Sequence, residues 1–225
     1  AARDLIVQLK PDRIEDIIAA IALNRPGPLQ SKAVETFIDC KHGRKKPEYL
    51  HPALENILSE TYGAIVYQEQ VMLIAHELAG FTMAEADNLR KAMGKKNEQL
   101  MTRYLKKFVD GCVERGIELK KAQEFAEKLK GFGHYAINKS HSAAYGIIAY
   151  ITAYLKAHFP LEFMLELLRR NVEKQDKLSE YISECQKIGI RVLQPDVNVS
   201  ETDFTIEGNS IRFGIAAIKN VGEKA

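Results

Sequence analysis

Apolar residues recur every three or four positions along most of this chain, which is the spacing of an amphipathic helix. The pattern is clearest in RIEDIIAAIAL (13–23), VYQEQVMLIAHELAG (66–80) and NEQLMTRYLKKFVDGCVERG (97–116), and the last two end at glycine. Proline and glycine in NRPGPL (24–29) interrupt it, because proline breaks a helix interior. Thr82 and Glu85 have the spacing of a capping box and predict a helix start. The sequence therefore predicts a mainly α fold with many helices.

The pattern changes near residue 191, where short stretches replace the helical spacing. DFTI (203–206) and SIRF (210–213) have the composition of β-strands, and EGN between them suits a turn. We place a boundary between residues 171 and 191. The sequence thus predicts a multi-helix domain over residues 1–172, followed by a small α+β segment over residues 173–225.

Length and composition permit a sizeable core but identify no partner. The chain has 225 residues, 46% of them hydrophobic, and a formal net charge of +2. Its three cysteines are far apart and form no CxxC pair, so we expect a reducing compartment, the cytoplasm. No apolar stretch has the length of a membrane span. Because the chain lacks an initial methionine and stops inside a helical pattern, we expect it to be a fragment of a longer protein.

Local charge is more informative than the whole-chain balance. Seven cationic residues and one acidic residue, Glu98, lie within RKAMGKKNEQLMTRYLKK (90–107), and KHGRKK (41–46) adds a second basic run. Arg90 and Lys91 would precede a helix end at Gly94, which would place the next cations at its tip. Such clusters suit phosphate groups, although a solvated basic helix face explains them equally well.

Another candidate is NKSHSAAYGIIAYITAYLKAHFP (138–160), an apolar segment with a basic, hydroxyl-rich start and no acidic residue. An ordinary helix carries Asp or Glu in its first turn, near the positive end of the helix dipole. The missing carboxylate suggests a place for an external anion, with Ser140 as N-cap. The alternative is a capped, well-packed helix with solvated basic residues, and the pattern predicts burial of Ile148 and Leu155. A row of small residues would let a neighbour pack closely: Ser142, Gly146, Ala149 and Ala153.

Several sharper motifs fail on context. GHYAINKS (133–140) lacks the second glycine of a P-loop and follows a helical pattern instead of a strand. Neighbours in SHS (140–142) point about 100° apart on a helix, which suits no catalytic pair. HELAG (76–80) lacks the second histidine of a zinc protease, and no Asp-x-Asp occurs, so we expect no metal site. Four residues of YGAIVYQEQVM could contact a base but are more often structural: Tyr62, Tyr67, Gln68 and Gln70.

Five motifs occur together in one known family. RPGPLQS, FIDCKHGR, YGAIVYQEQVM, EADNLRKAMGKK and NKSHSAAYGIIAYITAYLKAHFPLEFM have this order in the alpha subunits of bacterial DNA polymerase III, the replicative C-family polymerases, which the chain resembles from residue 9 onward. The resemblance implies a fingers domain followed by the start of a clamp-binding, helix-hairpin-helix region, which FGIAAIKNVGEKA (213–225) would open. It also implies template-directed nucleotidyl transfer by a DNA-directed DNA polymerase, with the fragment inactive alone.

The family's fingers close over the incoming deoxynucleoside triphosphate, and the resemblance implies which residues contact it. The candidates for nucleotide binding are Arg90, Lys95, Lys96, Lys139, Ser140, His141 and Tyr145. Lys139 and Arg90 would meet the phosphates. His141 and Tyr145 would face the sugar or base. The candidates for DNA binding are Arg25, Lys91, Arg103, Lys219 and Gly222.

The resemblance also implies cofactors and partners for the full enzyme. Catalytic aspartates holding Mg2+ would lie in a palm domain outside this chain. The implied partners are primer-template DNA, the nucleotide, the sliding clamp and other replisome subunits, with no membrane. Two other classes stay open: a helical nucleic-acid-binding module without a nucleotide pocket, and a helical protein-interaction scaffold. The first would bind DNA with a strong salt dependence and poor competition by nucleoside triphosphates, while the second would not bind DNA at low salt.

Overall fold

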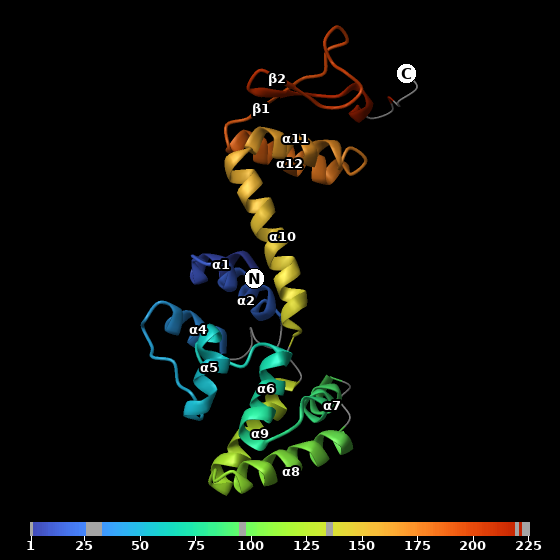
Figure 1. Ribbon diagram of the computed structural model, residues 1–225. Coiled ribbons are helices and arrows are strands. Elements are labelled where there is room, and N and C mark those ends of the chain that lie inside the picture. Colours follow the sequence, from blue (N-terminus) through green and yellow to red (C-terminus); the bar gives the residue numbers. More distant parts are fainter. Residues whose placement is uncertain (1, 26–32, 95–97, 134–136, 219–220, 222–225) are drawn as a thin grey trace. The chain divides into compact units, whose positions relative to one another are not determined.

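The computed structural model confirms a mainly α fold with a small sheet near the carboxyl end (Figure 1). It describes residues 2–25, 33–94, 98–133, 137–218 and 221. Two compact units divide between residues 150 and 151, while the predicted domain boundary between residues 172 and 173 stays a prediction. Helix α10, Lys139–His158, contributes its first part to one unit and its remainder to the other.

The first unit is built of helices whose apolar faces meet in two clusters. One cluster lies among α1, α2 and α4, and the other among α5 to α9. Two short 3-10 helices, Pro52–Leu54 and Ser59–Thr61, flank α5. The helices among the described residues of this unit before α10 are α1 Ala2–Leu9, α2 Ile14–Leu23, α4 Ala33–Lys41, α5 Glu55–Leu58, α6 Gln68–Ala79, α7 Met83–Gly94, α8 Glu98–Glu114 and α9 Leu119–Gly133.

Local signals set the helix ends in the larger cluster. α6 ends at Gly80, whose φ of 68° is the left-handed conformation that glycine adopts readily. Thr82 and Glu85 form the predicted capping box of α7, because each side chain accepts the other residue's backbone N–H. α8 then crosses the end of α6 so closely that a Cβ on Gly111 would overlap the Ala79 carbonyl oxygen. This crossing therefore requires glycine at residue 111.

The first part of α10 packs on α2 through its small residues. Ser142 and Gly146 are buried, and a Cβ on Gly146 would lie 2.9 Å from Cγ1 of Ile18. Because successive helical residues are about 100° apart, Ile148 lies on the face opposite Gly146, and it is 56% exposed. Leu155 is 40% exposed. The prediction that Ile148 and Leu155 are buried is wrong, because the small-residue face of the helix makes the contact.

The second unit combines two helices with a three-stranded sheet. α11, Pro160–Arg169, and α12, Gln175–Lys187, lie side by side and share an apolar cluster with the sheet (Figure 1). The strand order is β1-β3-β2, in which β1, Arg191–Leu193, is parallel to β3, Ser210–Arg212, and β2, Thr205–Glu207, is antiparallel to it. The strands predicted around DFTI and SIRF are therefore confirmed as β2 and β3.

Candidate functional site

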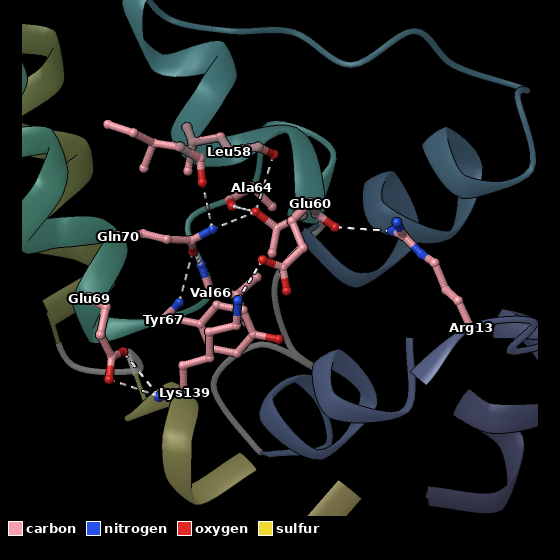
Figure 2. Close-up of polar contacts among 11 residues, drawn as sticks. Arg13, Leu58, Glu60, Ala64, Val66, Tyr67, Glu69, Gln70 and Lys139 are labelled. Atoms are coloured by element: carbon pink, nitrogen blue, oxygen red, sulfur yellow. Dashed lines mark hydrogen bonds and ion pairs between the residues drawn. The ribbon is translucent and has the colours of Figure 1, made fainter. Parts of the chain in front are cut away.

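A buried polar network shapes the turn that leads into α6 (Figure 2). Oε1 of Gln70 accepts hydrogen bonds from the backbone N–H groups of Val66 and Tyr67, at 2.8 and 3.0 Å. Nε2 of Gln70 donates to Oγ1 of Thr61 at 2.8 Å and to the carbonyl oxygen of Ile57 at 3.3 Å. Because Gln70 is buried and its amide is fully engaged, its role is structural and it does not contact a base.

The same turn is joined through its backbone to the residues before α10. The N–H of Gln68 donates to the carbonyl oxygen of Ile137 at 2.9 Å, and the N–H of Ile137 donates to that of Val66 at 3.4 Å. These bonds form an isolated parallel bridge between Tyr67 and Ile137. The amino-terminal ends of α6 and α10 are therefore held side by side.

Glu69 supplies the carboxylate that the sequence of α10 lacks. Its two side-chain oxygens lie 3.1 and 3.0 Å from the backbone nitrogen of Lys139 (Figure 2). Oε1 also accepts from Nδ2 of Asn138 at 2.8 Å. A negative charge is favourable here, because the helix dipole is positive at its amino-terminal end. The place predicted for an external anion is therefore occupied by an acid from α6.

Asn138, not Ser140, caps α10. The helix begins at Lys139, and Oδ1 of Asn138 accepts a hydrogen bond from the backbone N–H of His141 at 3.0 Å. Ser140 lies inside the first turn, where its Oγ donates to the same oxygen of Asn138. The prediction of Ser140 as N-cap is wrong, because asparagine is an equally good cap and stands at the residue before the helix.

The ammonium group of Lys139 has one acidic partner and one aromatic neighbour. Its Nζ lies 2.6 Å from Oε2 of Glu60 and 5.5 Å from the centre of the Tyr67 ring. The Lys139 side chain is 41% exposed and that of Glu60 is 32% exposed. Tyr67 is buried, and its hydroxyl has no hydrogen-bond partner among the described residues. Burial, and then the charges of Glu60 and Glu69, raise the pKa of Tyr67, so that its hydroxyl stays neutral.

Arg90 approaches the same turn from α7. Its Nη1 donates to Oε1 of Gln68 at 3.1 Å, and its Nη2 lies 2.8 Å from Oδ1 of Asp87. Asp87 also accepts from Nζ of Lys91 at 2.7 Å. Hydrogen bonds from Lys91 and Arg90 lower the pKa of Asp87, so this carboxylate stays ionised beside both cations.

The first two residues of α6 thus contact both residues that were predicted to meet phosphate. Gln68 accepts from the guanidinium of Arg90, and Glu69 accepts from the backbone of Lys139. Both cations are partly exposed. The guanidinium of Arg90 and the backbone of Lys139 therefore contact adjacent residues of one turn, Gln68 and Glu69.

The other predicted site residues are exposed, partly buried or outside the described part of the chain. His141 and Tyr145 are exposed on one face of α10, with ring centres 4.8 Å apart. Arg103 is exposed on α8. Arg25 donates from Nε to the carbonyl oxygen of Ala22 at 3.3 Å, and burial lowers the pKa of its guanidinium. The predicted residues outside the described ranges are Lys95, Lys96, Lys219 and Gly222.

The second basic run is paired with the protein's own acids. Nζ of Lys41 lies 2.8 Å from Oδ2 of Asp16, and their side chains are only 5% and 0% exposed. Arg44 pairs with Asp39 at 2.8 Å. Burial raises the pKa of Asp16, but hydrogen bonds from Lys41 and Arg13 outweigh burial and lower it overall. Lys41 is therefore part of a buried ion pair of the fold, and Arg44 is part of an exposed one.

The acidic residues at this turn and the cap of α10 were not predicted from the sequence. Glu69 carries one signal, since it lies in the first turn of a helix, but its partner Lys139 is 70 residues away. Glu60 is 79 residues from the same lysine. Only the folded arrangement shows that both acids meet one cation.

Among the described residues, no three His, Cys, Asp or Glu side chains gather closely enough to hold a metal. That the residues holding Mg2+ lie outside this chain stays a prediction. Across the same ranges, no helix is both long enough and apolar enough to cross a bilayer. The cysteines are free and buried, and burial raises the pKa of Cys112 and of Cys185 to about 11.

Two family models match this chain. Residues 1–116 match the bacterial DNA polymerase III alpha subunit finger domain, and residues 189–225 match a helix-hairpin-helix motif. A fingers domain followed by this motif defines part of a DNA polymerase. The chain belongs to the family of bacterial DNA polymerase III alpha subunits.

Relatives from several bacteria align with nearly the whole chain. The DNA polymerase III subunit alpha of Aquifex aeolicus is 50% identical over 224 residues, which are 99% of this chain and 19% of that protein. The corresponding subunit of Pseudomonas aeruginosa is 47% identical over 98% of the chain and 19% of its own length. That of Bacillus subtilis is 45% identical over 99% of the chain and 20% of its own length. The chain thus spans only about a fifth of the length of these relatives.

Proposed function

We propose that this chain is the fingers part of a DNA-directed DNA polymerase and contacts the incoming deoxynucleoside triphosphate. The observation that supports the proposal is the turn at Gln68 and Glu69, which contacts the guanidinium of Arg90 and the backbone of Lys139. Membership in the polymerase family supports the activity, which belongs to the whole polymerase. This chain alone would be inactive.

The two cations offer complementary contacts to a triphosphate. The guanidinium of Arg90 is a planar fork of donors, whereas the ammonium of Lys139 is a compact charge with three donors. Each now contacts a carboxylate, so phosphate oxygens would replace acceptors of the same charge. Held in this way, the nucleotide is oriented, and negative charge that develops on its phosphates during transfer is stabilised. His141 and Tyr145 would face the sugar or base.

The remaining roles follow from the family and lie partly outside this chain. Palm residues beyond it would hold Mg2+, and the full protein would bind the sliding clamp and other replisome subunits. Primer-template DNA would contact cationic residues of the fingers and the helix-hairpin-helix region. The free, buried cysteines support a reducing compartment, the cytoplasm. The proposed DNA contacts are Arg25, Lys91, Arg103, Lys219 and Gly222.

Steady-state nucleotide incorporation by the full-length polymerase tests the nucleotide site. Lys139→Ala and Arg90→Ala should each raise the apparent KM for the nucleotide, or lower kcat, by about tenfold or more, because each removes a charged hydrogen-bond donor. Lys177→Ala is the matched control, since Lys177 also pairs with an acid at 2.7 Å, on the exposed surface of α12. Circular dichroism checks that each variant is folded. Wild-type kinetics in both site variants would contradict the proposal.

A second candidate function is nucleic-acid binding without a nucleotide pocket. The helix-hairpin-helix match over residues 189–225 favours it. It predicts DNA binding that weakens steeply with salt, together with unchanged nucleotide kinetics in Lys139→Ala and Arg90→Ala. The same set of variants therefore separates the two functions.

A further inference from the structure

Lys139 is held by two carboxylates that contact different parts of the residue. Glu69 accepts from the backbone N–H, at 3.1 and 3.0 Å, and Glu60 contacts the side-chain ammonium, at 2.6 Å (Figure 2). One acid therefore fixes the main chain of Lys139, and the other fixes the position of its charge.

The contacts of Glu69 can remain in place while Lys139 binds a ligand. They involve only the backbone of Lys139 and the side-chain amide of Asn138. The adjacent bridge between Tyr67 and Ile137 fixes the same junction through the backbone. Glu69 also occupies the amino-terminal end of α10, so a phosphate would reach the ammonium of Lys139 and not this backbone N–H.

The contact of Glu60 must instead be broken before the ammonium can point at a phosphate. The pair is partly exposed, with side-chain exposures of 41% and 32%, and exposed ion pairs are weak. A multiply charged phosphate group competes well against one carboxylate in such a setting. Neutralising Glu60 would therefore leave the ammonium free for the ligand.

We propose that Glu69 is a positioning residue for Lys139, whereas Glu60 is an internal competitor that occupies the ammonium until a nucleotide phosphate replaces it. This inference rests on the proposed nucleotide function of Lys139. It predicts effects of opposite sign for the two acids. Loss of Glu69 weakens use of the nucleotide, and loss of the charge of Glu60 strengthens it.

The test measures nucleotide incorporation by the full-length polymerase at saturating primer-template DNA. Glu60→Gln should lower the apparent KM for the nucleotide by about twofold to fivefold with kcat unchanged, which is the range expected for an exposed ion pair. The difference in apparent KM between Glu60→Gln and wild type should narrow as the KCl concentration is raised, because salt screens the ion pair of Glu60 with Lys139. Glu180→Gln, which neutralises the acid paired with Lys177 on α12, is the matched control and should change neither constant.

Two variants test the role of Glu69, one disruptive and one conservative. Glu69→Ala should lower kcat/KM by about tenfold, because the first turn of α10 loses its acceptor. Glu69→Gln keeps an acceptor oxygen and should retain most of the kcat/KM that Glu69→Ala loses. Glu60→Gln changes a partly exposed side chain, so it decides the proposal by itself if Glu69→Ala does not fold.

Lys139→Ala separates failure of this inference from failure of the proposed function. If Lys139→Ala is impaired but Glu60→Gln has an unchanged or raised KM, the inference is wrong and the nucleotide site stands. If Lys139→Ala behaves as wild type, the nucleotide site itself is wrong. In the double variant, Glu60→Gln should no longer lower KM. A KM lowered equally with and without Lys139 would overturn the inference, because Glu60 would then act by repulsion and not through the ammonium.

Discussion

Two regions of the first unit reverse the usual relation between hydropathy and burial. The first region comprises the turn that leads into α6 and the start of α2. Its polar residues Asp16, Thr61 and Gln70 are only 0% to 5% exposed. On α10, the apolar residues Ile147 and Ile148 are 49% and 56% exposed. The polar side chains of the first region can be buried because each one binds N–H groups, carbonyl oxygens or charges that would otherwise lack partners. The second region shows that an apolar residue is buried only if its own helix face has a neighbour.

The largest predicted effect concerns Asp16. Asp16→Ala should lower the free energy of unfolding by about 3 kcal/mol, since it leaves Lys41 buried with one acidic partner fewer. Urea unfolding followed by circular dichroism measures the change. Asp110→Ala removes an exposed acid of α8 in the same unit and should change the free energy of unfolding by less than about 0.5 kcal/mol. Equal effects of the two substitutions would contradict the buried role of Asp16.

The same carboxylate predicts an acid dependence. Its pKa in the folded protein lies below the ordinary value of 3.8, because hydrogen bonds from Lys41 and Arg13 outweigh the opposing effect of burial. Its stabilising contribution is therefore complete above the ordinary value and is lost as the pH falls through the lowered one. Urea midpoints measured between pH 6 and pH 3 should fall less steeply for Asp16→Asn than for wild type. Parallel curves would show that Asp16 does not titrate in this way.

The buried amide of Gln70 should have the next largest effect. Gln70→Ala leaves the N–H groups of Val66 and Tyr67 without their acceptor and should cost about 2–3 kcal/mol. Gln123→Ala on the exposed side of α9 is the control, expected within about 0.5 kcal/mol of wild type. Thermal unfolding of both variants gives the comparison. A Gln70→Ala variant as stable as wild type would show that water replaces the amide.

The packing of α10 on α2 predicts a smaller effect. Gly146→Ala places a Cβ 2.9 Å from Cγ1 of Ile18, and the required shift should cost about 1–2 kcal/mol. Gly131→Ala meets nothing within 4 Å on α9, so there alanine should stabilise by up to about 1 kcal/mol. A lowered free energy of unfolding for Gly146→Ala, together with a raised one for Gly131→Ala, would confirm the contact. Stabilisation by both would mean that α10 does not pack on Ile18.

The smallest effect is expected for the exposed apolar residues. Ile148→Ala should change the free energy of unfolding by about 0.5 kcal/mol or less, because the side chain is more exposed than buried. Ile74→Ala in α6 is the matched control, since Ile74 is 2% exposed and its truncation should cost about 2–5 kcal/mol. Similar losses from both would mean that Ile148 is covered in the folded protein.

Features set by residues close in sequence were predicted correctly. The capping box of Thr82 and Glu85, the helix end at Gly80, and the hairpin strands β2 and β3 each depend on a few neighbouring residues. The third strand, β1, was not predicted, because it has three residues and pairs with the distant β3. Helical spacing located the apolar residues of α10 but not the face that packs.

The candidate site was predicted only in part for the same reason. The basic residues Arg90 and Lys139 stood out because cations cluster locally in the sequence. Their acceptors Gln68, Glu69 and Glu60 lie 22, 70 and 79 residues away from them. Spacing along the chain cannot show such pairs, so the site was first assigned to an external anion although an internal acid occupies part of it.

The long separation between Glu69 and Lys139 also sets an order of events during synthesis. Helices α7, α8 and α9 lie between these residues in sequence and share one apolar cluster with α6, so the contacts within this cluster close shorter loops. We expect this cluster to form first. Glu69 then lacks its partner Lys139 until α10 has left the ribosome. The turn that carries the candidate site is therefore the last part of the first unit to be completed.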